Sequence, residues 1–165
     1  MSAWANLRRR ARRQARSSLS LRDGPLGIGL RLDDLVAIDI DADDPAEAGR
    51  IARLAEDVLG VTPAIRVGRA PRRQLIYRAP PGGGASWREQ GLVECLAGEG
   101  AYTVGFGVHP VTDRLFEWVG EDEPQNLPTD RLPVVGDDVL TAFRSPALST
   151  LVTPVSAAPP SASTA

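Results

Sequence analysis

The chain has 165 residues, enough for one modest domain with a single hydrophobic core. Its formal net charge is -2, but the charge is uneven, because six of the 19 basic residues fall between positions 8 and 16. All basic side chains are Arg; the absence of Lys excludes a phosphate-binding loop of the standard Lys-containing form. The single cysteine, Cys95, excludes an internal disulfide and a thiolate metal cluster.

The two ends differ in composition from the middle of the chain. Residues 1–23 form an Arg-rich leader and residues 145–165 a Pro-, Ser- and Ala-rich tail, so we expect the folded domain to span residues 24–144 with flexible ends. A basic leader on an acidic domain suits a polyanionic partner; a leader without a function is the alternative. No long apolar segment is present, which predicts a cytoplasmic protein without a signal peptide or membrane span.

Hydrophobic periodicity and turn residues predict an α+β fold. In chain order we expect strands at 27–32 and 35–41 joined as a hairpin, a helix from Asp44 to Gly60, strands at 64–67, 74–78, 92–96, 102–106 and 115–118, and a short helix near 137–143. Asp44 can cap the first helix, with Pro45 at its first position and Glu47 completing a capping box. Such an order predicts a mixed or antiparallel sheet with helices packed on one face.

The strand at residues 35–41, Leu-Val-Ala-Ile-Asp-Ile-Asp, carries two acids among apolar residues. Because side chains alternate along a strand, Asp39 and Asp41 share the face opposite to Val36, Ile38 and Ile40, roughly 7 Å apart at the backbone. Carboxylates this close raise each other's pKa and are costly to bury unless a cation neutralises them. Since Mg²⁺ favours one or two carboxylates plus substrate phosphates, the strand predicts a metal-dependent phosphoryl or nucleotidyl transfer site.

A third acid, Glu94, interrupts another apolar strand at residues 92–96. Three carboxylates can hold two Mg²⁺ ions about 4 Å apart, so Glu94 is a candidate third ligand beside Asp39 and Asp41. An exposed edge strand is the alternative explanation for Glu94. Asp44 needs no metal, since helix capping explains it.

Arginines surround the turn between the strands at 64–67 and 74–78. The candidates for binding phosphate by forked contacts are Arg66, Arg69, Arg72 and Arg73. A solvated hairpin is the alternative, and we prefer it for Arg78. The only histidine, His109, lies in a Gly-Val-His-Pro turn whose rigid backbone can aim the imidazole at a phosphate or a base; an ordinary surface histidine is the alternative.

Taken in order, these motifs resemble the bifunctional DNA primase/polymerase N-terminal domain, the prim-pol branch of the archaeo-eukaryotic primase superfamily, common in phages, prophages and plasmids. The resemblance spans about residues 27–133. It rests on Gly-Ile-Gly-Leu-Arg at 27–31, Val-Ala-Ile-Asp-Ile-Asp at 36–41, Arg-Val-Gly-Arg-Ala-Pro-Arg-Arg at 66–73, Val-Glu at 93–94, Gly-Val-His-Pro at 107–110 and Phe-Glu-Trp at 116–118.

The resemblance implies an RRM-like catalytic core and template-directed addition of nucleoside triphosphates on a DNA template. By position, Asp39, Asp41 and Glu94 resemble the catalytic acids that bind Mg²⁺ or Mn²⁺. The segment from Arg66 to Arg73 resembles the part that binds the triphosphate of the incoming nucleotide, and we include His109 in that nucleotide site.

The chain also departs from the family pattern. Many relatives place a phosphate-binding His where this chain has Arg72-Arg73-Gln74, and its only His follows Glu94. Relatives usually carry further segments on both sides, including a helicase or ATPase module, so we expect a truncated domain that works with a separate helicase or ATPase. Two other interpretations stay open: a non-catalytic remnant that binds DNA or a replication partner, and a metal-dependent nuclease.

Overall fold

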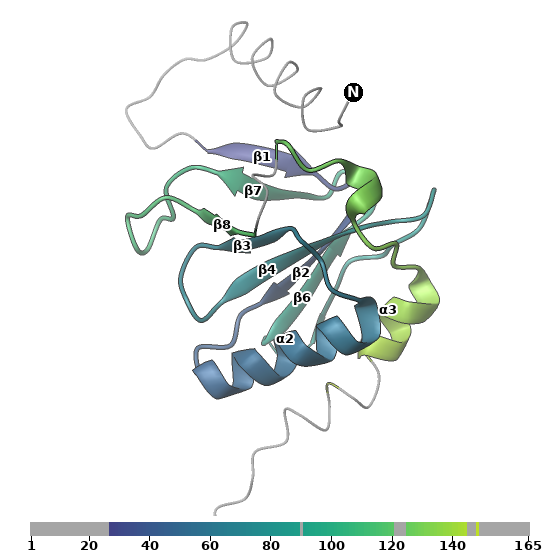
Figure 1. Cartoon of the computed structure of the whole chain (residues 1–165), viewed down its shortest axis with the longest axis horizontal. Coiled ribbons are helices and arrows are strands. Elements are labelled where there is room, and N and C mark those ends of the chain that lie inside the picture. The colour runs from purple at the N-terminus through teal and green to yellow at the C-terminus, as the bar shows by residue number, and fades with distance from the viewer. Residues whose placement is uncertain (1–26, 90, 121–124, 145–147, 149–165) are drawn as a thin grey trace, which may run out of the picture.

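The computed structural model describes residues 27–89, 91–120, 125–144 and 148 (Figure 1). The predicted leader, residues 1–23, and nearly all of the predicted tail, residues 145–165, lie outside this part of the chain, so the domain boundaries stay predictions. Among the helices in the described ranges, none has the length and apolar character needed to cross a membrane.

Two antiparallel sheets and two α-helices form the described fold (Figure 1). The larger sheet has six strands in the order β5-β6-β2-β4-β3-β8, and β1 pairs with β7 in a separate two-stranded sheet. The elements are β1 Ile28–Arg31, β2 Leu35–Ile40, α2 Pro45–Leu59, β3 Ile65–Val67, β4 Arg73–Arg78, β5 Trp87–Glu89, β6 Val93–Ala97, β7 Tyr102–Phe106, β8 Glu117–Val119, the 3-10 helix η1 Thr129–Arg131 and α3 Asp137–Arg144. The α+β prediction with an antiparallel sheet is confirmed.

The central strand β2 separates two hydrophobic clusters. On one face Val36, Ile38 and Ile40 are fully buried with the apolar residues of α2 and α3, so both helices cover this face of the sheet. On the other face Ala37 packs with Leu30 of β1, among other apolar residues. The apolar cluster under β1 covers only part of that second face, and the remainder carries polar side chains.

Helix α2 begins and ends as the sequence predicts. The carboxylate of Asp44 accepts a hydrogen bond from the backbone N–H of Glu47 at 2.7 Å, and Pro45 occupies the first helical position. The helix ends where Gly60 adopts a φ of 92°, which favours glycine, and the Gly60 N–H donates to Glu56 O.

The predicted hairpin between the first two strands is wrong. A turn does form at Asp33-Asp34, and the Leu35 N–H donates to Leu32 O, but β1 pairs with β7 and the neighbours of β2 are β4 and β6. The turn contains no Gly, which a tight two-residue hairpin favours, so the chain passes from one sheet to the other there. Strand β5 was not predicted, because three residues are too short for a periodic pattern.

Candidate active site

A row of polar side chains crosses the six-stranded sheet on the face opposite the helices. Directly paired residues of neighbouring antiparallel strands project to the same side, with Cβ atoms roughly 5 Å apart. The register pairs Glu94 of β6 with Asp39 of β2, Asp39 with Gln74 of β4, and Gln74 with Arg66 of β3. Acid, amide and guanidinium groups from four strands therefore stand next to one another.

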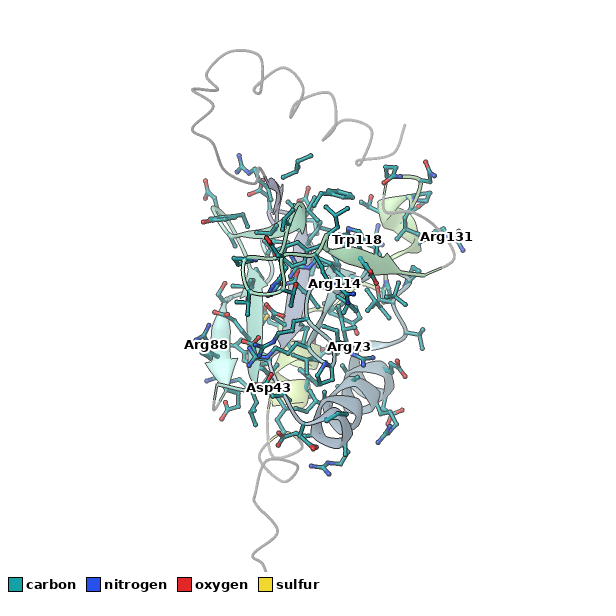
Figure 2. All side chains as sticks on the ribbon, turned by 90° about the vertical axis from the view of Figure 1, so that its left-hand side faces the viewer. Asp43, Arg73, Arg88, Arg114, Trp118 and Arg131 are labelled. Atoms are coloured by element: carbon teal, nitrogen blue, oxygen red, sulfur yellow. The ribbon has the colours of Figure 1, made fainter. Side chains whose placement is uncertain are left out.

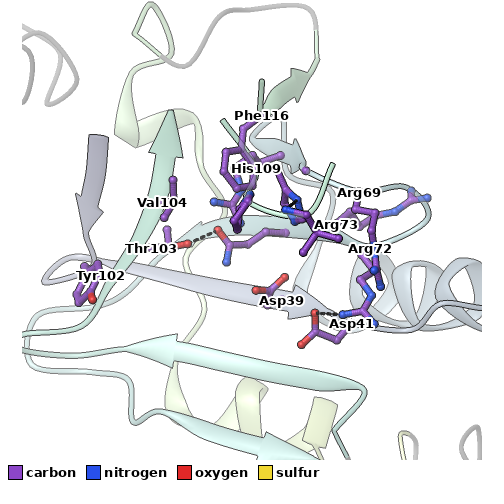
Figure 3. Close-up of a pocket in the computed structure, with 15 residues that line it drawn as sticks. Asp39, Asp41, Arg69, Arg72, Arg73, Tyr102, Thr103, Val104, His109 and Phe116 are labelled. Atoms are coloured by element: carbon purple, nitrogen blue, oxygen red, sulfur yellow. Dashed lines mark hydrogen bonds and ion pairs between the residues drawn. The ribbon is translucent and has the colours of Figure 1, made fainter. Parts of the chain in front are cut away.

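A cavity of about 500 Å³ lies over this row (Figure 3). Its size is that of a pocket for a small organic ligand. Seven of the eight residues predicted for the site line it, namely Asp39, Asp41, Arg66, Arg69, Arg72, Arg73 and His109. The eighth, Glu94, is not among the described residues that line the cavity, although it neighbours Asp39 on the sheet.

Asp39 lies in the middle of the row, and its neighbours only partly compensate the cost of burying its negative charge. Burial raises the pKa of its carboxyl from 3.8 to about 6, with further rises from Asp41 and Glu94. The Arg66 charge opposes this rise, and the Gln74 amide opposes it more weakly. A carboxyl held in this way binds a proton or a metal cation more strongly than an ordinary surface aspartate does.

Arg66 is buried with unused hydrogen-bond donors. Only 7% of the residue is exposed, and within the described chain its Nε and Nη1 have no hydrogen-bond partner. Its Cζ lies 4.4 Å from the centre of the Phe116 ring. Burial lowers its pKa while Asp39 counteracts that effect. Because an unmade donor costs about 1–3 kcal/mol, an anionic ligand in the cavity would relieve a real penalty.

Gln74 is a site residue that the sequence analysis missed. Only 1% of it is exposed, the Thr103 hydroxyl donates to its Oε1 at 2.8 Å, and in the described part of the chain its Nε2 has no partner. The sequence analysis placed Gln74 at the start of the predicted strand 74–78 and gave it no role beside the neighbouring arginines. Strand alternation was the available signal, because Gln74 and the buried Ile76 share a face.

His109 is fixed by its own turn. Its Nδ1 accepts hydrogen bonds from the backbone N–H groups of Val111 at 3.2 Å and Thr112 at 3.3 Å. In the neutral imidazole this leaves Nε2 as the donor. The ring also packs edge-on against Phe116, with centroids 5.3 Å apart. The rigid turn predicted from the sequence therefore exists and lines the cavity, while the role of the imidazole stays a prediction.

Gly68 allows the two loops of the site to pack together. A Cβ at this position would lie 2.6 Å from His109 Cδ2 and even closer to the Phe116 ring, so any side chain would displace them. The Thr112 hydroxyl donates to Gly68 O at 3.3 Å and ties the same loops together. Close packing of the two loops therefore requires Gly at position 68 of the Arg-Val-Gly-Arg segment.

Comparison with models of protein families matches residues 1–130 to Prim-Pol, described as bifunctional DNA primase/polymerase, N-terminal. The chain belongs to this family. At the family level, Prim-Pol membership means DNA primase/polymerase nucleotidyl transfer, with DNA and nucleotides as substrates. No curated protein and no solved structure matches the chain. The match starts at residue 1 and so includes the segment that the sequence analysis assigned to a separate leader.

Two of the three predicted acids of this Prim-Pol domain form ion pairs with arginines. Arg88 projects from the edge strand β5 (Figure 2), and its Nη2 lies 2.6 Å from Glu94 Oε2. Asp41 Oδ1 accepts from Arg72 Nη1 at 3.3 Å. Strand β6 lies inside the sheet, between β5 and β2, so Glu94 is not on an edge strand.

A metal is implied by the family, and the acids have the chemistry to hold it. Among the described residues no three His, Cys, Asp or Glu side chains already form a group that could hold a metal ion. Asp39 and Glu94 are nevertheless cross-strand partners, and the pKa of Asp39 is raised mainly by burial and further by Asp41 and Glu94. Adjacent carboxylates are a donor set that suits a hard divalent cation.

Asp43 is a second residue that the sequence analysis did not place in the site. Its Oδ1 accepts from Arg69 Nη2 at 2.5 Å and from Arg72 Nε at 2.8 Å, and its Oδ2 accepts from Arg72 Nη2 at 2.6 Å. The bond from Arg72 is the main reason why the pKa of Asp43 falls to about 2. Two arginines predicted to bind phosphate therefore already hold a carboxylate.

Proposed function

We propose that this Prim-Pol domain catalyses template-directed nucleotidyl transfer, with a nucleoside triphosphate bound in the cavity. The observation that carries the proposal is the order of the row, in which Glu94 and Asp39 stand beside donors of Gln74 and Arg66 that have no partner among the described residues. The acidic end suits Mg²⁺ or Mn²⁺, and the donor end suits phosphate oxygens. From the family resemblance, we place the activity in phage, prophage or plasmid replication beside a separate helicase or ATPase.

In this mechanism Asp39 and Asp41, with Glu94, would hold the metal. When bound, divalent ions in such a site polarise the phosphate and activate the attacking hydroxyl. Arg66 donates to the triphosphate through its forked guanidinium, and Gln74 and His109 Nε2 add neutral donors. The 3′ oxygen of the growing strand attacks the α-phosphorus, the bond to the bridging oxygen breaks, pyrophosphate leaves and the hydroxyl proton passes to water.

Dinucleotide synthesis tests the proposal. The full chain is incubated with single-stranded DNA, labelled nucleoside triphosphates and Mg²⁺ or Mn²⁺, beside a variant that combines Asp39→Ala with Asp41→Ala. We expect labelled products from the wild type alone, and none after chelation of the metal. Absence of product with every metal and template tried would favour the non-catalytic remnant, and loss of labelled DNA without incorporation would favour a nuclease.

Asp43→Asn is expected to strengthen triphosphate binding. The change removes a negative charge next to the anion site and frees donors of Arg69 and Arg72. Isothermal titration with inorganic triphosphate should show an affinity several-fold above that of the wild type. Asp57→Asn, the same change on an exposed position of α2, serves as the control. A weaker affinity in the Asp43 variant would mean instead that Asp43 orients the two arginines for the ligand.

A further inference from the structure

The small sheet presents exposed apolar side chains beside the cavity. Tyr102 of β7 is 68% exposed and Val104 is 37% exposed, and both line the cavity. A Cβ at Gly29 of β1 would lie 3.8 Å from Tyr102 Cδ2, and one at Gly27 would lie 3.6 Å from Val104 Cγ1. Two neighbouring positions on β1 are therefore glycines, and Arg31, the register partner of Tyr102, forms an ion pair with Asp33. We call Tyr102, Val104, Gly27 and Gly29 the glycine shelf.

The glycine shelf has no evident structural task. No hydrogen bond, ion pair or ring contact of the Tyr102 side chain is found within the described ranges, and its ring adds nothing to either hydrophobic cluster. A large aromatic side chain exposed beside a cavity is typical of a ligand contact. Gly27 and Gly29 also belong to the Gly-Ile-Gly-Leu-Arg segment, for which the proposed mechanism gives no role.

The cavity has two chemically different ends. Figure 3 shows Tyr102 at one end and Arg69 and Arg72 at the other, with Asp39 between them. A nucleoside triphosphate has the same polarity, because a charged triphosphate and a flat apolar base stand at opposite ends of the sugar. When the phosphates contact the arginines, the base lies at the opposite end of the cavity, beside the glycine shelf.

We propose that the glycine shelf is the nucleobase platform of the site, where the base of the incoming nucleoside triphosphate stacks on the Tyr102 ring. The inference rests on the proposed function. Aromatic stacking accepts any base, because every base has a π face, as an enzyme that copies a template requires. Gly29 keeps the approach to the ring open, and Val104 extends the apolar surface.

Isothermal titration of the full chain in Mg²⁺ with dATP and, separately, with inorganic triphosphate tests the platform. Wild type should bind dATP more tightly than inorganic triphosphate. Tyr102→Ala should weaken dATP binding about tenfold or more, as expected for loss of a base stack, without changing triphosphate binding. Tyr102→Phe should keep both affinities. Gly29→Leu, whose Cβ meets only ordinary contacts, should cover the ring and weaken dATP binding alone.

The outcomes separate the platform from the proposed function. Equal affinity of wild type for dATP and inorganic triphosphate, or an unchanged dATP affinity in Tyr102→Ala, overturns the platform and leaves the triphosphate site standing. A parallel loss of both affinities in Tyr102→Ala also overturns it. If wild type binds neither probe, the proposed function fails and the platform with it. If Tyr102→Ala weakens binding of a single-stranded oligonucleotide but not of dATP, the shelf serves the template and the proposal is wrong.

Discussion

Asp39→Asn is expected to lower nucleotide incorporation by on the order of 1,000-fold and, at the same time, to make the metal-free protein more stable at neutral pH. The loss of activity follows because the variant lacks the central carboxylate of the row, and a metal site can supply several kcal/mol of transition-state stabilisation. The gain in stability follows because the amide keeps the shape of the side chain without its buried charge.

The pH dependence of stability gives this prediction a definite sign. The pKa of Asp39 is about 6 in the folded protein, against 3.8 for the ordinary group, so between these values the folded state binds more protons than the unfolded state. Stability therefore falls as the pH rises from about 4 to about 6 and stays lowered above that range. The raised pKa of Asp39 lowers the free energy of unfolding by up to about 3 kcal/mol at neutral pH.

Urea denaturation between pH 4 and pH 8 in the presence of a chelator measures this effect. The wild type should lose stability across the window, and Asp39→Asn should lose less and be the more stable protein at pH 7. Asp57→Asn on the exposed surface of α2 should follow the wild-type curve. A parallel pH dependence in wild type and Asp39→Asn would show that Asp39 is not the group whose pKa is raised.

Local sequence patterns predicted most of the elements and identified two acids that the structure places side by side. Asp39 and Glu94 were found because a charged residue interrupts an apolar strand, and strand alternation placed Asp39 on the face opposite to Val36 and Ile38. The capped helix α2 was predicted for a similar reason, since its start and end signals lie within the segment itself. Such signals need no knowledge of which strands pair.

The missed features depend on pairings that are distant in sequence. Gln74 joins the site because β4 lies beside β2 in a register that sets it opposite Asp39, and no local pattern contains that register. Asp43 binds Arg69 and Arg72, which follow it by 26 and 29 residues. The wrong hairpin has the same origin, because β1 pairs with the distant strand β7 in preference to its neighbour in sequence.

Arg66→Met is expected to reduce the affinity for inorganic triphosphate on the order of 100-fold. The buried guanidinium has donors at Nε and Nη1 without partners in the described chain, and hydrogen bonds to charged groups contribute about 1.5–3 kcal/mol each. Methionine keeps an unbranched apolar side chain against the Phe116 ring, so the loss should reflect the missing donors rather than a collapsed pocket. Isothermal titration of the two proteins measures the difference, with Arg53→Met on the exposed side of α2 as the control.

The same variant should also change the titration of Asp39. Arg66 lowers the pKa of Asp39, so its removal should push the pKa above 6 and extend the pH range over which stability falls. Arg66→Lys separates charge from geometry: a lysine ammonium restores the pH dependence but lacks the forked donors, so triphosphate affinity should recover only in part. Full recovery by lysine would show that charge alone holds the ligand, and an unchanged affinity in Arg66→Met would place the triphosphate elsewhere. Each result assigns a distinct role to Arg66, the one cation that is buried beside the acids among the described residues.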